Sequence, residues 1–346
     1  MDSAQLLALI EAFKERTVVV VGDVVADEFV YGRVARVSRE APVLILEYDS
    51  TEVVAGAGGN AANNVADLGG KASLVALVGH DEIGRRLRGS LHRRVNVSRV
   101  VRDTGRKTTV KTRILAGGIH SAKQQVVRID RGIGQPVAAR TRAAFERAAL
   151  AALDSADAVL VSDYGSGIVT PSLATRIRGA LRKRGMPIPV LVDSRYRLLD
   201  YQGLTACTPN ESEVEQAIGV RINDDLDVLE RAGREILRRT RMEAVLITRG
   251  SRGMALFVHG AATVHISIFG SDEIADVTGA GDTVMATMAL SLASGGTFEQ
   301  AAHLANYAGG IVVMKRGTAT VSGDELIAAV RRDAPKDRRV ARGARG

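Results

Sequence analysis

Short runs of β-branched and aliphatic residues alternate with amphipathic stretches, and this alternation constrains the fold more than any other feature. The runs are TVVVVGD (17–23), ASLVALVG (72–79), DAVLVSD (157–163), IPVLVD (188–193) and EAVLITR (243–249). Consecutive apolar positions are typical of strands that are buried on both faces. Helical periodicity fills intervals such as TRAAFERAALAALDS (141–155) and LERAGREILRRT (229–240). The pattern predicts an α/β fold in which helices cover both faces of a mostly parallel sheet.

Polar side chains stand at the ends of several of these runs. Asp23, Asp163 and Asp193 close three of them, and Thr248 with Arg249 closes a fourth. Ligands of parallel α/β sheets bind at the carboxyl ends of the strands. We therefore expect the functional site at this edge of the sheet.

Residues 28–50 and 106–130 depart from this pattern, because both alternate with a period of two and contain no helical stretch. In TTVKTRILA, Lys111 and Arg113 fall on the same face of the expected strand, and QQVVRID places Arg128 on one face of another. We interpret the two segments as a small β-sheet that projects from the main body as a lid.

The net charge of +8 raises the question of a nucleic-acid partner. The last twelve residues, PKDRRVARGARG, contain five basic residues and one acidic residue, and so supply half of this charge. The chain has no Trp and only 3% aromatic residues with which to stack on bases. An anionic small molecule therefore fits better than nucleic acid. We expect one domain over residues 1–334, followed by a basic, disordered tail over 335–346.

The sequence carries no pattern that would direct the chain out of the cytoplasm. No apolar run reaches the roughly 20 residues that a membrane span requires. The N-terminal MDSAQLLALIEAFKER has an amphipathic helical pattern without the basic start or cleavage site of a signal peptide. The single cysteine, Cys207, rules out an internal disulfide. We expect a cytoplasmic protein with no membrane partner.

A first glycine-rich stretch, VVAGAGGNAANNVADLGG, contains Gly56-x-Gly58-x-x-Ala61. This spacing resembles a dinucleotide-binding loop, but such a loop should follow the first strand of the sheet, and that strand has already ended at Gly22. Two other interpretations remain open. The glycines could serve close packing alone, or Asn60 and its neighbouring asparagines could form directional hydrogen bonds to a ligand.

The second glycine-rich stretch, DVTGAGDTVMA (276–286), is more informative. Gly279 and Gly281 free consecutive backbone amides to face an anion, and the helix that begins there adds the positive end of its dipole. Such a site suits a phosphoryl group in transfer, and Asp282 beside it could accept the proton of an attacking hydroxyl. The alternative is that Asp282 merely caps its helix, although Thr278 or Asp276 could do so.

Over nearly its whole length the chain resembles the ribokinase family of carbohydrate kinases, and within it the D-glycero-β-D-manno-heptose 7-phosphate kinases. The resemblance is carried by VGDVVADEFVYG, RVSREAPV, GAGGNAANNVADLGG, QQVVRID, VSDYGSG, TPNESEVE, TRGSRGM, DVTGAGDTV and RGTATVS. The glycine–aspartate element marks the broad family, whereas RVSREAPV and TPNESEVE point to the heptose branch. The resemblance implies a three-layer αβα fold with a β-sheet lid, and a homodimer formed through that lid.

The resemblance also implies roles for individual residues. Asp282 would be the catalytic base, and Gly279, Ala280 and Gly281 would form the anion hole. On the nucleotide side, MgATP would contact the following residues: Asn210, Glu213, Thr248, Arg249, Gly250, Gly253, Asn306 and Arg195. Among these, Asn210 and Glu213 would organise Mg²⁺ and the phosphates through water, with Glu213 as the metal residue.

On the sugar side, the resemblance implies that Asp27, Gly56 and Asn60 contact the sugar. The substrate phosphate requires cations, for which Arg36, Lys111, Arg113 and Arg128 are the candidates, and we expect at least two of them to clamp it. A solvated basic face is the alternative for each.

Two positions depart from the pattern of the family. Ala57 replaces the second glycine of the sugar-binding pair, and Asp193-Ser194-Arg195 replaces Asp-Pro-Lys, so Arg195 keeps the charge but not the shape of the usual lysine.

The implied reaction is transfer of the ATP γ-phosphate to O1 of the heptose 7-phosphate. Bifunctional relatives carry a nucleotidyltransferase domain after the kinase, and 346 residues leave no room for it, so only the kinase activity is expected. The alternatives are a kinase for another sugar or sugar phosphate, such as fructose 1- or 6-phosphate, and a binding module without turnover.

Overall fold

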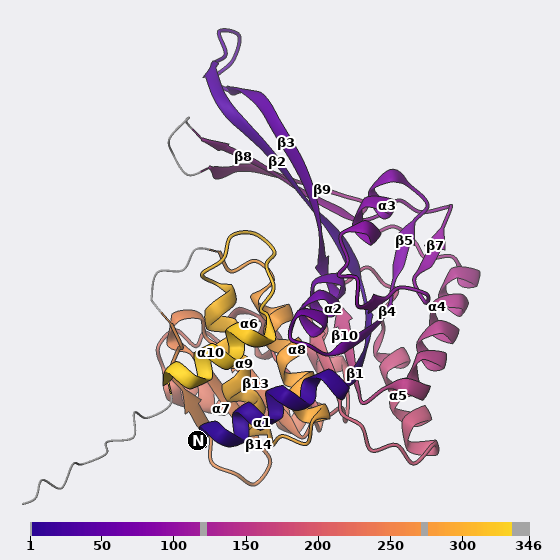
Figure 1. Cartoon of the computed structure of the whole chain (residues 1–346), viewed down its shortest axis with the longest axis vertical. Helices are drawn as coiled ribbons and strands as arrows, with labels where there is room; N and C mark the ends of the chain where they lie inside the picture. The colour runs from indigo at the N-terminus through magenta and orange to yellow at the C-terminus, as the bar shows by residue number, and fades with distance from the viewer. Residues whose placement is uncertain (1, 118–122, 271–275, 334–346) are drawn as a thin grey trace, which may run out of the picture.

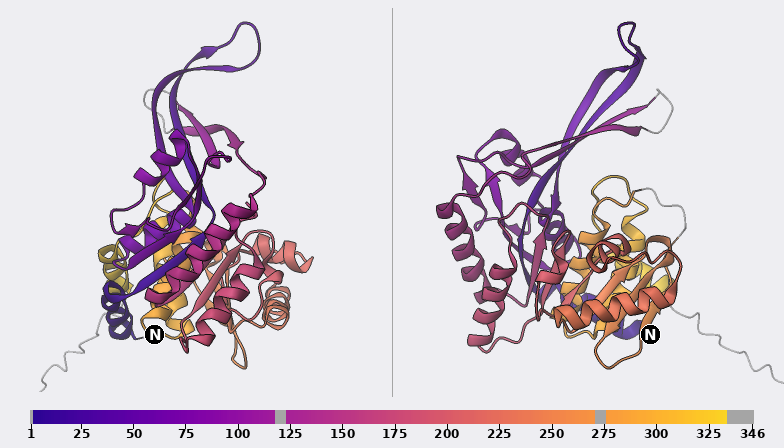
Figure 2. Two further views of the ribbon diagram at one scale, coloured as in Figure 1. Left: turned by 90° about the vertical axis from the view of Figure 1, so that its right-hand side faces the viewer. Right: turned by 180° about the vertical axis from the view of Figure 1, so that it is seen from behind.

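A large central sheet between two layers of helices forms the main body of the protein (Figures 1 and 2). The structure is a computed structural model and describes residues 2–117, 123–270 and 276–333. Within these residues, the strand order of the central sheet is β15-β14-β13-β12-β11-β10-β1-β4-β6. Neighbouring strands run parallel from β6 to β13, whereas β14 and β15 are antiparallel additions at one edge. The predicted α/β class with a mostly parallel sheet is confirmed.

The strands of the central sheet are β1 (Thr17–Gly22), β4 (Lys71–Val75), β6 (Val95–Asn96), β10 (Ala158–Asp163), β11 (Val190–Ser194), β12 (Ala206–Cys207), β13 (Ala244–Thr248), β14 (Met254–Val258) and β15 (Val264–Ile266). One helical layer consists of α1 (Ser3–Ala12), α2 (Gly58–Asp67), α8 (Ala280–Ala293), α9 (Phe298–Val312) and α10 (Gly323–Asp333). The other consists of α4 (Ala139–Ala152), α5 (Pro171–Lys183), α6 (Glu211–Ile218) and α7 (Leu226–Thr240). Short 3₁₀ helices occupy Phe13–Glu15, Leu153–Ser155, Leu198–Asp200 and Gly250–Arg252. No helix of the described ranges is both long and apolar enough to span a bilayer.

Strand β1 shows why the apolar runs are continuous. Val18 and Val20 pack into the core beneath α2 and α8, whereas Val19 and Val21 pack into the core beneath α4 and α5. All four side chains are fully buried. A strand covered by helices on both sides must be apolar at successive positions, because either face of the pleat meets a core.

The run ASLVALVG differs from the expectation of a single strand. The chain leaves the central sheet after Val75, and the carbonyl of Ala76 accepts a hydrogen bond from the amide of Val101. Strand β5 (Leu77–Gly79) then pairs in parallel with β7 (Val101–Asp103) as a separate two-stranded sheet. Helix α3 (Glu82–Gly89) packs beside β5 at the base of the lid (Figure 1).

A second sheet projects from the body and is called the lid below (Figures 1 and 2). Its strands, in the order β3-β2-β8-β9, are β2 (Val24–Val37), β3 (Leu44–Ala57), β8 (Val110–Gly117) and β9 (Gln124–Arg131). Both expected lid segments contribute to it, but its first two strands extend beyond residues 28–50, because the β2–β3 ladder continues down to the pair Val24 and Ala57. Residues 118–122 and the expected tail at 335–346 lie outside the described residues.

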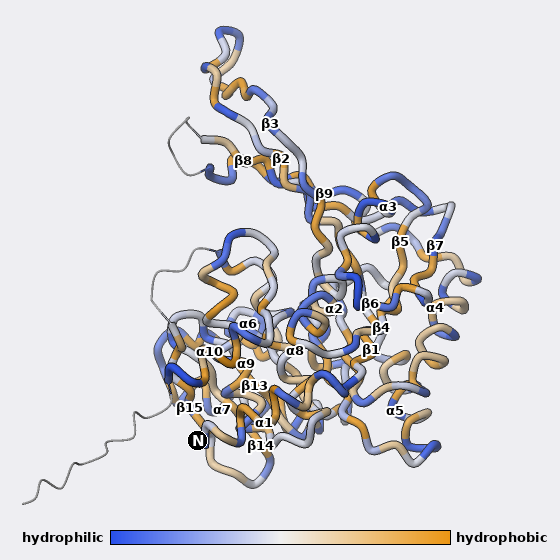
Figure 3. Tube along the Cα trace, viewed as in Figure 1, coloured by the Kyte–Doolittle hydropathy of each residue, from blue (hydrophilic) through white to orange (hydrophobic). Residues whose placement is uncertain are grey.

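Hydrophobic residues occur along the lid, which projects away from the main body (Figure 3). Several of them have exposed side chains. Those exposed are Val34, Val37, Val43, Leu44, Tyr48, Val126, Val127 and Ile129. Every residue of β9 is exposed, so the outer strand of the lid lacks a covering layer within the described chain.

Candidate active site

The carboxyl ends of the parallel strands and the N-terminus of α8 enclose a cavity of about 400 Å³. It lies at the edge of the sheet where the sequence placed the functional site. The sequence-predicted residues that line it are Arg195, Asn210, Glu213, Thr248, Gly250, Gly253, Gly279, Ala280, Gly281 and Asn306. These residues come from segments between β11 and α9, so only the tertiary fold brings them together.

Asp282 lies in the first turn of α8, directly after the cavity-lining Gly281. Its side chain is buried, with 3% of the residue exposed. One carboxylate oxygen accepts a hydrogen bond from Nδ2 of Asn60 (2.9 Å), and the other accepts one from the hydroxyl of Tyr164 (3.0 Å). Both oxygens therefore face other parts of the chain, which argues against a mere capping role.

The environment of Asp282 opposes its ionisation. Burial raises the pKa of the Asp282 carboxyl to about 7, while the hydrogen bonds from Asn60 and Tyr164 act in the opposite direction. The negative charge of Asp27 raises the pKa further, and the positive charge of Lys111 lowers it. A carboxyl group with a pKa near neutrality can take up and release a proton at physiological pH, as a general base must.

Gly279 shapes the entrance to this helix. It occupies the N-cap position of α8 in the left-handed region, with φ +79°. A Cβ atom at this position would lie 2.5 Å from Nδ2 of Asn60. Only glycine satisfies both conditions. Of the first-turn amides of α8, that of Ala280 donates to the carbonyl of Val277 (3.2 Å), whereas those of Gly281 and Asp282 have no partner among the described residues and remain available to an anion.

Asn210 and Glu213 form a reciprocal capping box at the start of α6. The Asn210 side chain accepts from the amide of Glu213 (2.9 Å), and the Glu213 carboxylate accepts from the amide of Asn210 (3.0 Å). The pair therefore has a structural role beside the predicted one. Burial raises the pKa of Glu213, although its carboxylate also lines the cavity.

Asp193, which the sequence placed at the functional edge of the sheet but to which it gave no role, also lines the cavity. Burial raises its pKa well above the usual range, and the charges of Asp282 and Glu213 add to this effect. Two carboxylates that line one cavity and repel each other fit a hard divalent cation, which would relieve their repulsion. Within the described residues no three acidic, His or Cys side chains are grouped to hold a metal alone, so phosphate oxygens would have to complete the coordination shell.

The remaining nucleotide-side predictions differ in their placement. Arg249 does not line the cavity, because its guanidinium is buried in an ion pair with Glu211 (2.7 Å). Asn306 lines the cavity and donates through Nδ2 to the carbonyl of Ser267 (2.9 Å), which fixes the segment after β15. Arg195 is exposed at the rim of the cavity.

Asp27, on β2, lies at the junction of the lid and the body. Its buried carboxylate forms an ion pair with Arg113 on β8 and accepts a hydrogen bond from the hydroxyl of Thr318 (3.2 Å). Gly56 on β3 allows this approach, because a Cβ atom there would collide with Asp27. The lid thereby presents an acidic side chain close to Asp282.

The four candidate phosphate-binding cations occupy different environments. Lys111 is half-buried, its pKa is lowered by burial, and its ammonium lies 5.8 Å from the centroid of the Tyr164 ring. Arg113 is the cross-strand neighbour of Arg128, whose guanidinium pairs with Asp130 on its own strand (2.9 Å). Arg36 is exposed near the outer end of β2, nine residues beyond Asp27 and thus up to roughly 30 Å along the strand. Arg36 is therefore separated from the other candidates.

The first glycine-rich stretch packs against the chain itself. A Cβ atom on Gly58 would lie 2.9 Å from the carbonyl oxygen of Asp23. The asparagines form directed contacts, since Asn60 reaches Asp282, and Asn64 accepts from the hydroxyl of Thr283 (3.0 Å). The glycines thus serve close packing, while Asn60 points toward the site.

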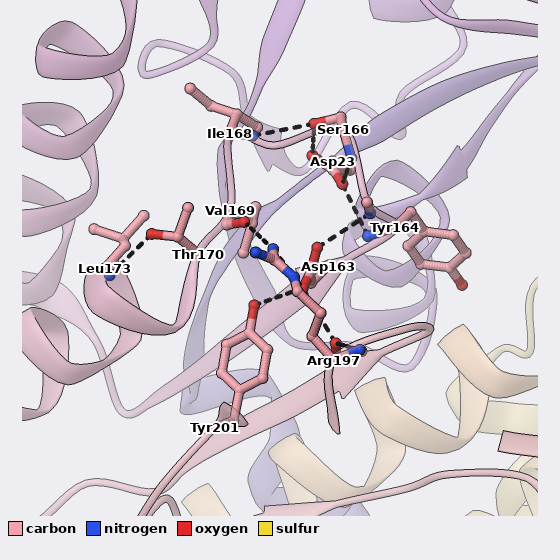
Figure 4. Close-up of polar contacts among 12 residues, drawn as sticks. Asp23, Asp163, Tyr164, Ser166, Ile168, Val169, Thr170, Leu173, Arg197 and Tyr201 are labelled. Atoms are coloured by element: carbon pink, nitrogen blue, oxygen red, sulfur yellow. Dashed lines mark hydrogen bonds and ion pairs between the residues drawn. The ribbon is translucent and has the colours of Figure 1, made fainter. Parts of the chain in front are cut away.

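Tyr164, in the loop after β10, is a second residue that the sequence analysis did not assign. The only signal was its place in VSDYGSG, directly after a strand that ends in Asp163. Its side chain lines the cavity and donates to Asp282. Figure 4 shows the loop and the acidic side chains that hold it.

Comparisons with known proteins identify the family and the fold of the chain. The pfkB family carbohydrate kinase model matches residues 15–324. Among solved structures, phosphofructokinase-2 from Escherichia coli in complex with potassium superposes with a TM-score of 0.72 at 18% identity, covering 92% of this chain and 98% of that one. Ribokinase from Arabidopsis thaliana, complexed with ribose and ATP, superposes with a TM-score of 0.68 at 20% identity, covering 91% and 98%. At these identities the likeness shows the fold alone, which is the ribokinase-like α/β fold.

The fold and the family match define an ATP-dependent sugar kinase. The chain belongs to the pfkB family of carbohydrate kinases, whose members use ATP with a divalent metal. Its relatives include the bifunctional protein HldE of Caulobacter vibrioides, 42% identical over 95% of this chain, and that of Geobacter metallireducens, 40% identical over 94%. The chain spans 66% and 65% of the length of these two proteins, slightly less than two thirds.

Proposed function

We propose that this kinase transfers the γ-phosphate of MgATP to O1 of D-glycero-β-D-manno-heptose 7-phosphate, giving the 1,7-bisphosphate. The step would serve ADP-heptose synthesis for the lipopolysaccharide core, in the cytoplasm where ATP is available. The proposal draws on the heptose-branch motifs RVSREAPV and TPNESEVE, and on the similarity to HldE proteins.

The observation that carries the proposal is the position of Asp282. It directly follows the residues of α8 that line the cavity, the charge of Asp27 on the lid acts on it, and its pKa is about 7. Asp282 would accept the proton of the sugar hydroxyl as its oxygen attacks phosphorus, while the α8 amides stabilise the charge on the phosphoryl oxygens. Asp27 would orient the sugar through its hydroxyls.

Mg²⁺ would be held near Glu213 through water, with Asp193 facing the same space, and would neutralise charge on the phosphates. The carboxylate pair fits this hard cation. The residues of the chain then have only to position the nucleotide, and Arg195 at the rim adds a positive charge toward the phosphates.

The substrate phosphate would be clamped by at least two of the lid cations. Lys111 and Arg113 lie on the same strand as next-but-one neighbours, and Arg128 is opposite Arg113 on β9. Arg113 already neutralises Asp27, so it would also tie the phosphate end of the sugar to the hydroxyl-binding end. Binding of a dianionic phosphate here would draw the lid toward the body and exclude water.

A homodimer through the lid is part of the proposal. The exposed apolar side chains of β9 and of the outer β2–β3 hairpin would be covered by a second copy. Sedimentation velocity of wild type and of an Ile129→Glu variant tests this, because the charge should produce monomers. Leu226→Glu, at an exposed apolar position on α7, is the matched control and should leave the assembly unchanged.

A coupled ADP-release assay over a panel of sugar phosphates tests the reaction. The heptose 7-phosphate should give the largest kcat/KM, with fructose 1- and 6-phosphates and unphosphorylated sugars well below it. A preference for a fructose phosphate would reassign the substrate within the family. Nucleotide binding without ADP release on any sugar would refute the kinase proposal.

A further inference from the structure

The hydroxyl of Tyr164 is one of the two hydrogen-bond donors that hold the carboxylate of Asp282. The donors come from unrelated parts of the chain: Asn60 belongs to α2, whereas Tyr164 follows β10. Burial and the nearby negative charges of Asp282 and Asp193 raise the pKa of the Tyr164 phenol well above its usual value. The phenol of Tyr164 therefore stays protonated, and remains a hydrogen-bond donor, over the pH range in which the kinase is active.

The backbone that carries Tyr164 is held by two buried carboxylates (Figure 4). Asp23, at the end of β1, accepts from the amides of Tyr164 (2.8 Å) and Ser166 (3.1 Å), and also from the Ser166 hydroxyl. Asp163, at the end of β10, accepts from the amide of Gly165 (3.1 Å). The side chains that anchor Asp163 in turn are Ser194, Arg197 and Tyr201.

The backbone of the loop at residues 163–167 is held in one conformation. Gly165 has φ +82° and Gly167 has φ +80°, so two glycines in the left-handed region flank Ser166. Charge-assisted hydrogen bonds to a buried carboxylate are about twice as strong as neutral ones, and here two such carboxylates are devoted to one short loop. Figure 4 shows the ring of Tyr164 pointing away from the Asp163–Tyr201 contact. The ring instead lines the nucleotide cavity and lies beneath the ammonium of Lys111.

We propose that Tyr164 is a positioning residue for the phosphoryl-transfer step: its hydroxyl, fixed through the Asp23-held loop, orients the Asp282 carboxylate toward the acceptor hydroxyl. The inference rests on the proposed function only in taking Asp282 as the base for a sugar hydroxyl. It holds for whichever sugar the enzyme phosphorylates. The ring of Tyr164 has a separate role, because it lines the nucleotide cavity and contacts the ammonium of Lys111.

Tyr164→Phe separates the two tasks, because it removes the hydroxyl and keeps the ring. Loss of a hydrogen bond to a charged group should lower kcat by about 10- to 100-fold. The KM of both substrates, and the Kd of a non-hydrolysable ATP analogue measured by calorimetry, should stay within about twofold. Tyr164→Leu, which also removes the ring, should lower kcat by the same factor. It should in addition raise the KM of both substrates.

Tyr196→Phe is the matched control. Tyr196 is 62% exposed, its ring lies beside Gly165, and its hydroxyl makes no hydrogen bond to another described residue. The same chemical change there should leave kcat within about twofold of wild type. A Tyr164→Phe enzyme with the kcat of wild type would overturn the inference. It would also be overturned if nucleotide affinity and melting temperature fell together with kcat, because the hydroxyl would then act through the fold.

A crystal structure of Tyr164→Phe provides a readout that is independent of turnover. With Asn60 as its remaining donor, the Asp282 carboxylate should rotate relative to wild type. An unchanged carboxylate would overturn the positioning role even if kcat fell. The wild-type enzyme is assayed on the whole sugar panel in parallel. A wrong heptose assignment would be seen in the wild-type substrate preference, whereas a wrong Tyr164 inference would be seen only in the comparison of variant with wild type.

Discussion

Asn60 donates one side-chain amide to two acceptors on the same turn, the carboxylate of Asp282 (2.9 Å) and the carbonyl of Gly279 (3.2 Å). It thereby connects the start of α2 to the start of α8, 222 residues away in the chain. The amide of Asn60 also counteracts the effect of burial on the pKa of Asp282. Asn60, which the sequence analysis expected at the sugar, thus also holds the carboxylate that we propose as the base.

Asn60→Ala should therefore raise the pKa of Asp282, because the ionised carboxylate loses a donor. The proposed base acts in its ionised form, so the acid limb of kcat should move to higher pH, and kcat at neutral pH should fall by about tenfold or more. A kcat–pH profile of wild type and variant measures this. If Asn60 served the sugar alone, KM would rise while the acid limb stayed in place.

Asp282→Asn should lower kcat by orders of magnitude while ATP binding changes little, because Asp282 is not among the residues that line the cavity proposed for the nucleotide. In wild type, kcat should decline as the pH falls through about 7, where Asp282 becomes protonated. The folded-state pKa is raised, so ionisation of Asp282 destabilises the fold as the pH rises through this range. Asp282→Asn should consequently melt no lower than wild type at pH 8; near-normal turnover would contradict the assignment.

Ala57 has φ +55°, a conformation that disfavours any side chain, at the position where the family usually has glycine. Ala57→Gly should stabilise the fold by about 1 kcal/mol, because removal of the strain outweighs the greater freedom of glycine in the unfolded chain. Urea unfolding of both proteins checks this. Gly89→Ala is the reverse substitution at a site where the added Cβ would meet no atom within 4 Å. It should not lower the free energy of unfolding by as much as about 1 kcal/mol.

Gly279→Ala should destabilise the fold by about 1–3 kcal/mol, because it places a Cβ atom in the left-handed region. It should also lower kcat, since that Cβ would displace Asn60. Gly281→Ala is the matched change two residues later, and its Cβ would meet no atom within 4 Å. Thermal melting should distinguish the two, with Gly281→Ala close to wild type. Equal destabilisation would argue against the role given to Gly279.

Arg113→Ala and Arg128→Ala should raise the KM for the sugar phosphate strongly and leave the KM for ATP nearly unchanged. Arg131→Ala provides the control. Arg131 pairs with Glu28 (2.7 Å), and Glu28 is next to Asp27 on β2 and therefore points to the opposite face of the lid. Steady-state kinetics with both substrates varied give the answer. Equal effects on the two KM values would show that the arginines act through the fold rather than through the substrate phosphate.

Local sequence was sufficient to predict the elements whose physics is local. The continuous valines of β1 indicated a strand covered on both faces, and the glycines before Asp282 indicated a helix start open to an anion. The period-two alternation around Lys111 indicated a separate sheet, although the end of that sheet at Ala57 depended on pairing with Val24. In each of these cases neighbouring residues determine both the backbone conformation and the chemistry.

What only the tertiary structure decided is which of these groups meet. Asp282 contacts Tyr164 across 118 residues and Asn60 across 222, and Asp193 of β11 lines the same cavity as Glu213 of α6. Arg249, which was expected at the nucleotide, instead pairs with Glu211. Such contacts depend on the order of strands in the sheet and on the direction in which each loop leaves it. Burial then determines the ionisation of these carboxyl groups, and no single segment of the sequence specifies burial on its own.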